Sequence, residues 1–309
     1  MLNISKPGNK GSAIILIMFM AGIIMTVGLG FNWLVKEHIK AAEGLKNKVE
    51  AILKARSAYD TLVYLILNGL VSQKEIVLLG VQGLATLKTI PLNGTDVVLA
   101  DDVKAGVQDS NGLLSLVNMD ADMMARLIGK IGRVENAAIP VESLLDWVDP
   151  DDFSRTNGAE KFYYQGRQAP YKPRNHALRY KEEIALVRGI DQEIYRKIEP
   201  YLTILPATAF NPNTAGDELL KAVLDINDES LNKLKDYTTK KPMSSDEALF
   251  FLTGRRLIYH HEESHYYPSR FMEIKIKVGA PRSLYTIKAG LNFNQNLSFP
   301  YSVVYWQEE

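Results

Sequence analysis

The sequence contains no cysteine, and its 36 Lys and Arg residues are balanced by 36 Asp and Glu residues. The lack of cysteine excludes disulfide bonds, thiolate metal sites and cysteine nucleophiles. Because the net charge is zero, the chain as a whole has no attraction to nucleic acid or to an anionic membrane surface. With 46% hydrophobic residues over a length of 309, it is also too apolar to be disordered, and we expect one large or two modest folded domains.

Charge is missing from Ser12 to Phe31, an apolar stretch near the N-terminus. As a helix rising 1.5 Å per residue it would reach roughly 30 Å, the thickness of a bilayer core. The alternative is a cleaved secretory signal, which has a shorter apolar region ending in small residues, whereas Trp33 and Leu34 follow closely here. Basic residues lie on both sides of the stretch and do not orient it. We predict one membrane-spanning helix.

No proline interrupts the next stretch, from Val35 to Asn68, and its apolar residues recur at helical spacing. The helix is therefore expected to continue beyond the membrane. Its apolar stripe is formed by Ile39, Ala42, Leu45, Val49, Ile52 and Leu53. Because a small sheet can cover only part of such a stripe, we predict that Ile39, Leu45 and Val49 bind partner subunits.

The rest of the chain alternates between two patterns. Residues 86–109 show strand-like alternation around tight turns at Asn93-Gly94 and Asp101-Asp102. Helical patterns follow within 111–252, near 113–131, 141–148, 182–202 and 218–234. Strand-like alternation then returns at 270–278, 284–292 and 301–306. This order predicts a sheet that is interrupted by a helical insert.

The N-terminal features together resemble the pilin and pseudopilin family: a basic leader, Gly11-Ser12 before the apolar run, and one long helix half in lipid. The resemblance implies that a prepilin peptidase cuts between Gly11 and Ser12. Leu16 would then be the fifth mature residue, where most pilins carry a glutamate that pairs with a neighbour's terminal amine. Leu16 is thus a predicted contact with partner subunits.

Further motifs narrow the resemblance to the K-type minor pseudopilin of the type II secretion system, general secretion pathway protein K. In chain order they are LLDWVDPDD from Leu144, NGAE from Asn157, PYKPRN from Pro170, KEEIALVRGI from Lys181, PYLTILP from Pro200 and NPNTAGDELL from Asn211. K-type members characteristically lack the fifth-position glutamate. A first subunit in a filament would need no such carboxylate in lipid.

The resemblance implies an α+β fold. A transmembrane and long helix packs on a small antiparallel pilin-like sheet, which is interrupted by a large helical insert with SAM-like or helix-hairpin-helix-like units. We expect a leader at 1–11, a transmembrane helix at 12–35, a pilin-like α/β domain at 36–110 and 256–309, and the inserted domain at 111–255.

The function implied by the resemblance is structural and not enzymatic. The chain would stand at the tip of the secretion pseudopilus, initiating or capping it, beside the I- and J-type minor pseudopilins. The prepilin peptidase and the inner-membrane assembly platform would be further partners. The expected location is the bacterial inner membrane, crossed once, with the C-terminal domain in the periplasm.

Carboxylates cluster at Asp146, Asp149, Asp151, Asp152 and Glu160, around a turn. Oxygen ligands on flexible backbone suit calcium, although the spacing is not that of an EF-hand. Capping or solvated carboxylates are an equally good interpretation. The family is associated with calcium in its helical domain, and we therefore predict Asp149, Asp151, Asp152 and Glu160 as calcium ligands.

Two motifs suggest other functions. His261, Glu262 and His265 form an H-E-x-x-H string, the alternative being a membrane-anchored zinc protease, but Pro268 follows closely and no third ligand stands out. The segment 186–201 has a helix, a Gly189 turn and a second helix, as DNA-binding helical hairpins do. Asp191, where a second turn glycine would fall, would repel phosphate. We expect no nucleic-acid partner and interpret this hairpin as protein-binding.

Overall fold

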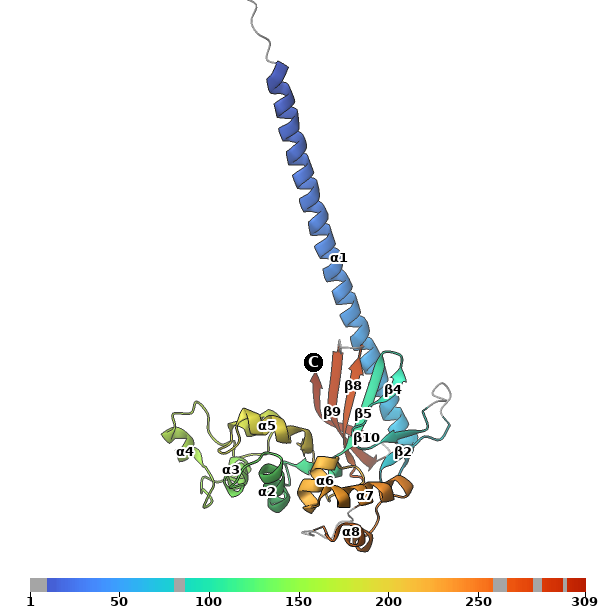
Figure 1. Cartoon of the computed structure of the whole chain (residues 1–309), viewed down its shortest axis with the longest axis vertical. Coiled ribbons are helices and arrows are strands. Elements are labelled where there is room, and N and C mark those ends of the chain that lie inside the picture. Colours follow the sequence, from blue (N-terminus) through green and yellow to red (C-terminus); the bar gives the residue numbers. More distant parts are fainter. Residues whose placement is uncertain (1–9, 81–86, 258–265, 280–284, 297–298) are drawn as a thin grey trace, which may run out of the picture. The chain divides into compact units, whose positions relative to one another are not determined.

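The computed structural model describes residues 10–80, 87–257, 266–279, 285–296 and 299–309 (Figure 1). The chain divides into two compact units, Met1–Leu53 and Lys54–Glu309. The long helix α1, Lys10–Asn68, contributes to both.

The first unit consists, in its described part, of the N-terminal portion of α1. Its apolar side chains are exposed, for example Ile17 and Ile24 at 64% and 68%. Among the described residues, α1 is the one helix with the length and apolar composition to cross a membrane. Proline is absent from it, and its five glycines are separated by apolar and other helix-compatible residues, so the helix continues without a break. The predicted continuous helix is confirmed.

The second unit contains a five-stranded antiparallel sheet in the order β10-β9-β8-β5-β4. Its strands are β4 (Val97–Ala100), β5 (Val103–Asp109), β8 (Phe271–Val278), β9 (Tyr285–Asn296) and β10 (Phe299–Glu308). In β8, Ile274 and Ile276 are buried and alternate with the charged Glu273 and Lys275, as expected for a sheet with one apolar face. Ile276 pairs with Ala105 on β5 and Ile287 on β9, and all three are fully buried.

The C-terminal portion of α1, from Lys54, packs against this sheet (Figure 1). Ala55 and Leu62 are fully buried, and the ring of Tyr59 meets Trp306 of β10 edge-on at 4.9 Å. An ion pair joins Lys54 to Asp102 at 2.5 Å. A second, small sheet follows α1, with β1 (Leu70–Val71), β2 (Glu75–Val77) and β3 (Thr89–Pro91) in that order.

The helical insert lies between β5 and β8, which are neighbours in the sheet. It contains α2 (Ala121–Lys130), α3 (Ala138–Val148), α4 (Lys161–Gly166), α5 (Gln192–Ile198), α6 (Asp217–Leu224), α7 (Asp228–Lys240) and α8 (Asp246–Thr253). Short 3₁₀ helices are η1 (Ser110–Gly112), η2 (Lys181–Leu186) and η3 (Glu199–Tyr201), and β6 (Leu114–Ser115) pairs in parallel with β7 (Leu202–Thr203). Leu127, Leu144, Ile184 and Leu219 belong to one apolar core, each at most 2% exposed.

A buried carboxylate holds the insert to the sheet. Asp109, the last residue of β5, is fully buried and accepts four hydrogen bonds. Its Oδ1 accepts from the backbone N–H groups of Asn111 (3.0 Å) and Ser269 (2.8 Å), and its Oδ2 accepts from Asn211 Nδ2 (3.1 Å) and Thr214 Oγ1 (2.8 Å). One side chain thus joins the chain leaving the sheet, the middle of the insert and the chain returning to β8.

A second polar contact between the insert and the sheet involves Glu273 of β8. Thr203 Oγ1 donates to Glu273 Oε1 at 2.5 Å, and Lys181 Nζ lies 3.7 Å from Glu273 Oε2. Gly290 leaves room for Tyr305 here, because a Cβ at this position would lie 2.3 Å from the Tyr305 ring. The insert therefore contacts the sheet at two polar sites, one at Asp109 and one at Glu273.

The structure corrects several details of the predicted helical insert. Residues 114–115 form strand β6, and α2 begins only at Ala121, where Asp120 caps it. The first arm of the predicted hairpin around Gly189 is the 3₁₀ helix η2. The predicted helix 218–234 is broken at Asp225, whose left-handed φ of 54° ends α6. The α+β architecture with its interrupting insert is confirmed.

Candidate functional site

The acidic cluster is built at the end of α3 and the start of α4. Asp149 follows the last residue of α3, and Glu160 is the N-cap of α4, so both helix termini bring a carboxylate to the connecting segment. Asp146, on the last turn of α3, is fully buried. Gly158 must be a glycine here, because a Cβ would lie 1.9 Å from Asp146 Oδ2.

Arg155 bridges two of these carboxylates. Its Nη1 lies 2.5 Å from Asp146 Oδ1 and 2.6 Å from Asp149 Oδ2. The backbone N–H of Arg155 also donates to Asp146 Oδ2 at 3.1 Å. A guanidinium group therefore occupies the position between Asp146 and Asp149 where a cation would be expected to neutralise them.

Two buried oxygen atoms of the cluster, Asp149 Oδ1 and Glu160 Oε1, have no hydrogen-bond partner among the residues that the structure describes. Glu160 is 3% exposed, and burial, together with the negative charge of Asp146, raises the pKa of its carboxyl group to about 7. Unpaired buried oxygens are uncommon in proteins and call for an explanation, such as an ion.

Asp151 and Asp152 lie differently, exposed on the turn between the two helices. Asp151 Oδ1 accepts from the backbone N–H of Phe153 at 2.8 Å, and Asp152 Oδ1 accepts from Asn175 Nδ2 at 3.0 Å. The structure thus brings Asp149 and Glu160 together with Asp146, while Asp151 acts as a local turn cap.

The carboxylate oxygens fit calcium in chemistry, and the two unpartnered atoms leave capacity for a cation. Within the described residues, however, no three His, Asp or Glu side chains are grouped so that they could hold a metal ion as they stand. Arg155 was missed in the sequence, where nothing distinguishes it from other arginines. Calcium binding stays a prediction.

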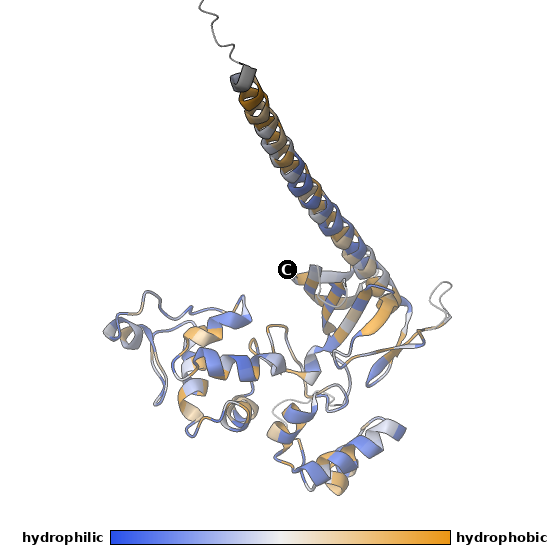
Figure 2. Cartoon of the chain, turned by 45° about the horizontal axis from the view of Figure 1, so that its top comes forward, coloured by the Kyte–Doolittle hydropathy of each residue, from blue (hydrophilic) through white to orange (hydrophobic). Residues whose placement is uncertain are grey.

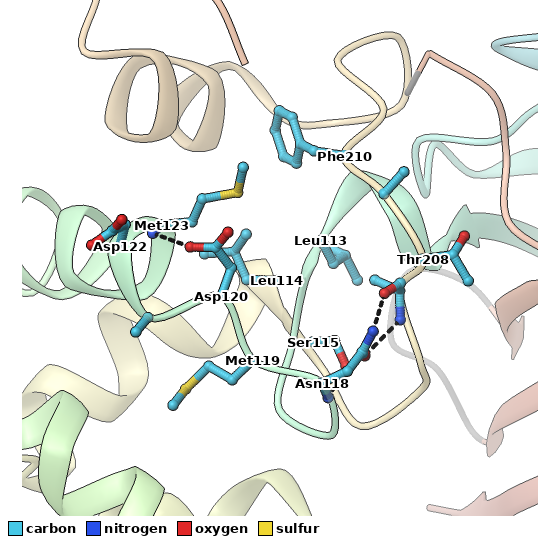
Figure 3. Close-up of a pocket in the computed structure, with 13 residues that line it drawn as sticks. Leu113, Leu114, Ser115, Asn118, Met119, Asp120, Asp122, Met123, Thr208 and Phe210 are labelled. Atoms are coloured by element: carbon cyan, nitrogen blue, oxygen red, sulfur yellow. Dashed lines mark hydrogen bonds between the residues drawn. The ribbon is translucent and has the colours of Figure 1, made fainter. Parts of the chain in front are cut away.

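A pocket of about 460 Å³ lies between the loop before α2 and the segment after β7 (Figure 3). Leu113, Met119 and Phe210 supply much of its apolar lining. Its polar side chains serve the fold: Asn118 hydrogen-bonds the backbone of Ala207 in both directions, and Asp120 Oδ1 accepts from Met123 N. The described lining residues include no histidine or lysine, and they form no acid–base pair.

The predicted partner-binding residues are exposed in the first unit. Leu16, Ile39, Leu45 and Val49 have exposed fractions of 63%, 52%, 66% and 47%. Gly11 and Ser12 lie in the first turns of α1. The H-E-x-x-H string of His261, Glu262 and His265 lies outside the described residues.

The fold is similar to that of a solved secretion-system protein. A chain in the crystal structure of the GspK-GspI-GspJ complex from the enterotoxigenic Escherichia coli Type 2 Secretion System matches with a TM-score of 0.60. The match covers 87% of this chain and 99% of that one, at 17% sequence identity. At this identity the match establishes the fold alone.

Sequence comparisons are more specific. Residues 103–207 match the family model for type II secretion system (T2SS) protein K. Type II secretion system protein K of Pectobacterium carotovorum subsp. carotovorum is 27% identical over 139 residues, 43% of this chain and 42% of the relative. The protein of Aeromonas hydrophila is 30% identical over 106 residues, 33% of this chain and 32% of the relative.

The aligned part of this chain thus spans less than half the length of these relatives. Residues 103–207 are therefore similar to the type II secretion system protein K family. The resemblance found in the sequence is confirmed. The acidic cluster, the pocket and the Asp109 junction all have residues within the matched segment.

Proposed function

We propose that this chain is a minor pseudopilin that stands at the tip of the type II secretion pseudopilus, as a structural subunit without catalytic activity. The match of residues 103–207 to protein K is the observation that carries this proposal. The similar solved chain comes from a complex of GspK with GspI and GspJ, so I- and J-type minor pseudopilins are the proposed partners. The pseudopilus, the prepilin peptidase and the inner-membrane assembly platform are proposed to act with it.

The uncharged part of α1 supports a tip position. At Leu16, no carboxylate is available to neutralise the terminal amine of a subunit above, and a bare charge in lipid is costly. We expect α1 to anchor the chain in the inner membrane with the second unit in the periplasm. Mass spectrometry of membrane-extracted protein should find Ser12 as the first residue. Gly11→Val should block this cut.

The assembly test uses the exposed stripe of α1. Leu45 is 66% exposed, so Leu45→Asp should leave the fold intact while placing an unpaired charge at the proposed contact. We expect the full-length variant to lose pull-down of the I- and J-type partners and to lower secretion, with an unchanged circular dichroism spectrum. Lys48→Asp, on the polar side of the same helix, is the control. Wild-type recovery of both partners with Leu45→Asp would argue against this interface.

Calcium is the proposed cofactor of the inserted unit. Asp149 and Glu160, which have unpartnered buried oxygens, would be its main ligands, with Asp152 close by. Arg155 supplies one positive charge to several carboxylates, and a bound divalent cation would supply the rest. Calcium at a hundredfold excess over Kd should stabilise the fold by about 2.7 kcal/mol. Thermal melts with calcium and with chelator test this. Equal midpoints would argue against calcium binding and would leave Arg155 to neutralise Asp146 and Asp149.

A further inference from the structure

The segment beside the acidic cluster has the opposite charge. Residues 153–181 contain seven Lys and Arg residues and one acidic residue, Glu160. The carboxyl group of Glu160 is buried and interacts with Asp146 and Asp149, so it does not offset charge at the surface. In a chain with no net charge, this concentration around α4 is a local feature (Figure 1, left).

An aromatic cluster gives this segment a fixed shape. The ring of Tyr164 lies 5.3 Å from Trp147, 5.3 Å from Tyr163 and 5.8 Å from Tyr171. Trp147 and Tyr164 are buried in the core of the insert, at 2% and 3% exposure. Tyr171 is 38% exposed, and the neighbouring Phe162 is 77% exposed. The cluster thus connects the core to aromatic groups at the surface. The segment around α4 is coloured by hydropathy in Figure 2, where its loops are largely hydrophilic.

Two guanidinium groups lie against one of these rings. The Cζ atoms of Arg167 and Arg188 are 5.0 Å and 4.7 Å from the centroid of the Tyr163 ring. Arg188 is held further by a hydrogen bond from its Nη1 to the Gly158 carbonyl oxygen at 2.9 Å. Stacking on an aromatic ring restricts a guanidinium group and leaves its in-plane N–H groups free to donate.

Arg167, Arg188 and two nearby lysines differ from their neighbours in having no ion-pair partner among the residues that the structure describes. Arg174 pairs with Glu183 at 2.7 Å, and Arg155 pairs with Asp146 and Asp149. By contrast, no carboxylate in the described part of the chain lies within 4.0 Å of the charged groups of Lys161, Arg167, Lys172 or Arg188. We call Lys161, Tyr163, Arg167, Tyr171, Lys172 and Arg188 the basic-aromatic patch.

We propose that the basic-aromatic patch binds an acidic segment of a partner protein, whose carboxylates are held by Arg167 and Arg188. Charge complementarity supplies the attraction, and the planar fork of arginine fits a carboxylate with two parallel hydrogen bonds. Phe162 and Tyr171 would pack against apolar groups of the same segment. Lys161 and Lys172 steer the acidic segment toward the arginines.

The composition of the patch favours a protein over an anionic membrane. Arg and Tyr are enriched at the energetic centres of protein interfaces. Attraction to a lipid surface needs only mobile lysines in number and no fixed side-chain geometry. Here the two arginines lie against the Tyr163 ring, which itself packs on the core. Such pre-ordered side chains lose less entropy when they bind a carboxylate in one geometry.

The test uses the full chain in nanodiscs of phosphatidylcholine, with calcium present, and a fluorescent oligoglutamate peptide as the probe. Fluorescence anisotropy should show binding that weakens as salt is added. Reversal of charge in Arg167→Glu and Lys172→Glu should each raise Kd by about tenfold or more. The matched control is Lys240→Glu, because Lys240 is exposed on α7 and outside the patch. It should change Kd by less than about twofold.

A conservative variant separates geometry from charge. Arg167→Lys keeps the charge but loses the fork and its stacking, so we expect a severalfold rise in Kd. Equal Kd values for wild type, Arg167→Glu and Lys240→Glu would overturn the proposal. So would displacement of the peptide by vesicles of phosphatidylglycerol at lower concentration than by unlabelled peptide, which would identify a lipid headgroup as the ligand. Circular dichroism confirms that each variant is folded.

Discussion

Asp109 and the acidic cluster at 146–160 are both buried carboxylate sites, yet they differ in how their oxygen atoms are satisfied. Each carboxylate oxygen of Asp109 accepts two hydrogen bonds, so four different groups donate to this side chain. In the acidic cluster, Asp149 Oδ1 and Glu160 Oε1 are buried without a partner. Burial alone therefore does not mark a binding site. Unused acceptor capacity is the feature on which the proposed calcium site rests, because such an oxygen would gain from a cation.

Among the tests of this difference, the largest effect on stability is expected for Asp109→Ala. The substitution leaves four donors buried without an acceptor, and each such group costs about 1–3 kcal/mol. We expect the free energy of unfolding to fall by at least about 4 kcal/mol, measured by denaturant titration. The control is Asp96→Ala, which removes a surface ion pair with Lys277 and should cost less than about 1 kcal/mol. A loss for Asp109→Ala as small as the control's would show that Asp109 does not hold the junction.

The same residue should make stability depend on pH. Burial raises the pKa of Asp109 from 3.8 to about 6 in the folded state, against the opposing effect of its hydrogen bonds. A raised pKa means that the folded state binds more protons than the unfolded state. The free energy of unfolding that Asp109 contributes in this way is fully present below pH 3.8 and is lost as the pH rises through about 6. Its size is on the order of 2–3 kcal/mol.

The measurement compares wild type with Asp109→Asn between pH 3.5 and 7, by thermal or denaturant unfolding at about ten values. Asparagine does not titrate, so the difference in the free energy of unfolding between the two proteins should change across this window. The variant is expected to be the less stable protein throughout, because its amide NH₂ meets hydrogen-bond donors. Parallel curves would mean that Asp109 has the same pKa in both states.

Arg155→Gln tests the other site. It removes the cation between Asp146 and Asp149 and leaves the buried charge of Asp146 without an ion pair. Because Arg155 is 39% exposed, we discount the cost of a fully buried pair to about 2 kcal/mol without calcium. Calcium should restore more stability to this variant than to wild type, read from thermal midpoints. Equal calcium effects in both proteins would indicate that Arg155 and calcium do not share the site.

The smallest effect is expected for the exposed carboxylates. Asp151→Asn keeps a side-chain oxygen that can accept from Phe153 N, so we expect a change below about 0.5 kcal/mol without calcium. Melts with and without calcium then show whether Asp151 and Asp152 act as ligands, as the sequence predicts. A loss of the calcium effect in Asp151→Asn would place the ion on the turn, and an unchanged effect would place it nearer Glu160.

Periodicity in the sequence predicted the elements that form long, regular patterns. The long helix α1 and the strands β5, β8, β9 and β10 were found in this way, because each repeats one spacing over many residues. The short elements were missed or misassigned. Strand β6 has two residues, and α4 has six, too few for a period to be recognised. Their existence depends on tertiary pairing, such as that of β6 with β7 across 86 intervening residues.

The acidic cluster was predicted as a set of carboxylates, and the structure sorted its members. Glu160 is buried and Asp149 half-buried, whereas Asp151 and Asp152 are exposed. Nothing in the local sequence distinguishes Asp149 from Asp151, since the two residues flank Pro150 directly on either side. Arg155 was not predicted, because nothing in the sequence distinguishes it from other arginines. The contact of Tyr163 with Arg188 was not predicted, because it joins two segments that the turn and η2 separate.

The long apolar helix α1, the order of sheet and insert, and the similarity to type II secretion system protein K could be read from the sequence alone, because they rest on long runs of residues and on local motifs. The tertiary structure decided which polar groups are satisfied, since that depends on which distant segments meet. Asp109 finds donors from residues up to 160 positions away, whereas Glu160 Oε1 finds none. The same packing placed Arg167 and Arg188 against one ring, with no carboxylate of the described residues paired to either, an arrangement that no local sequence pattern contains.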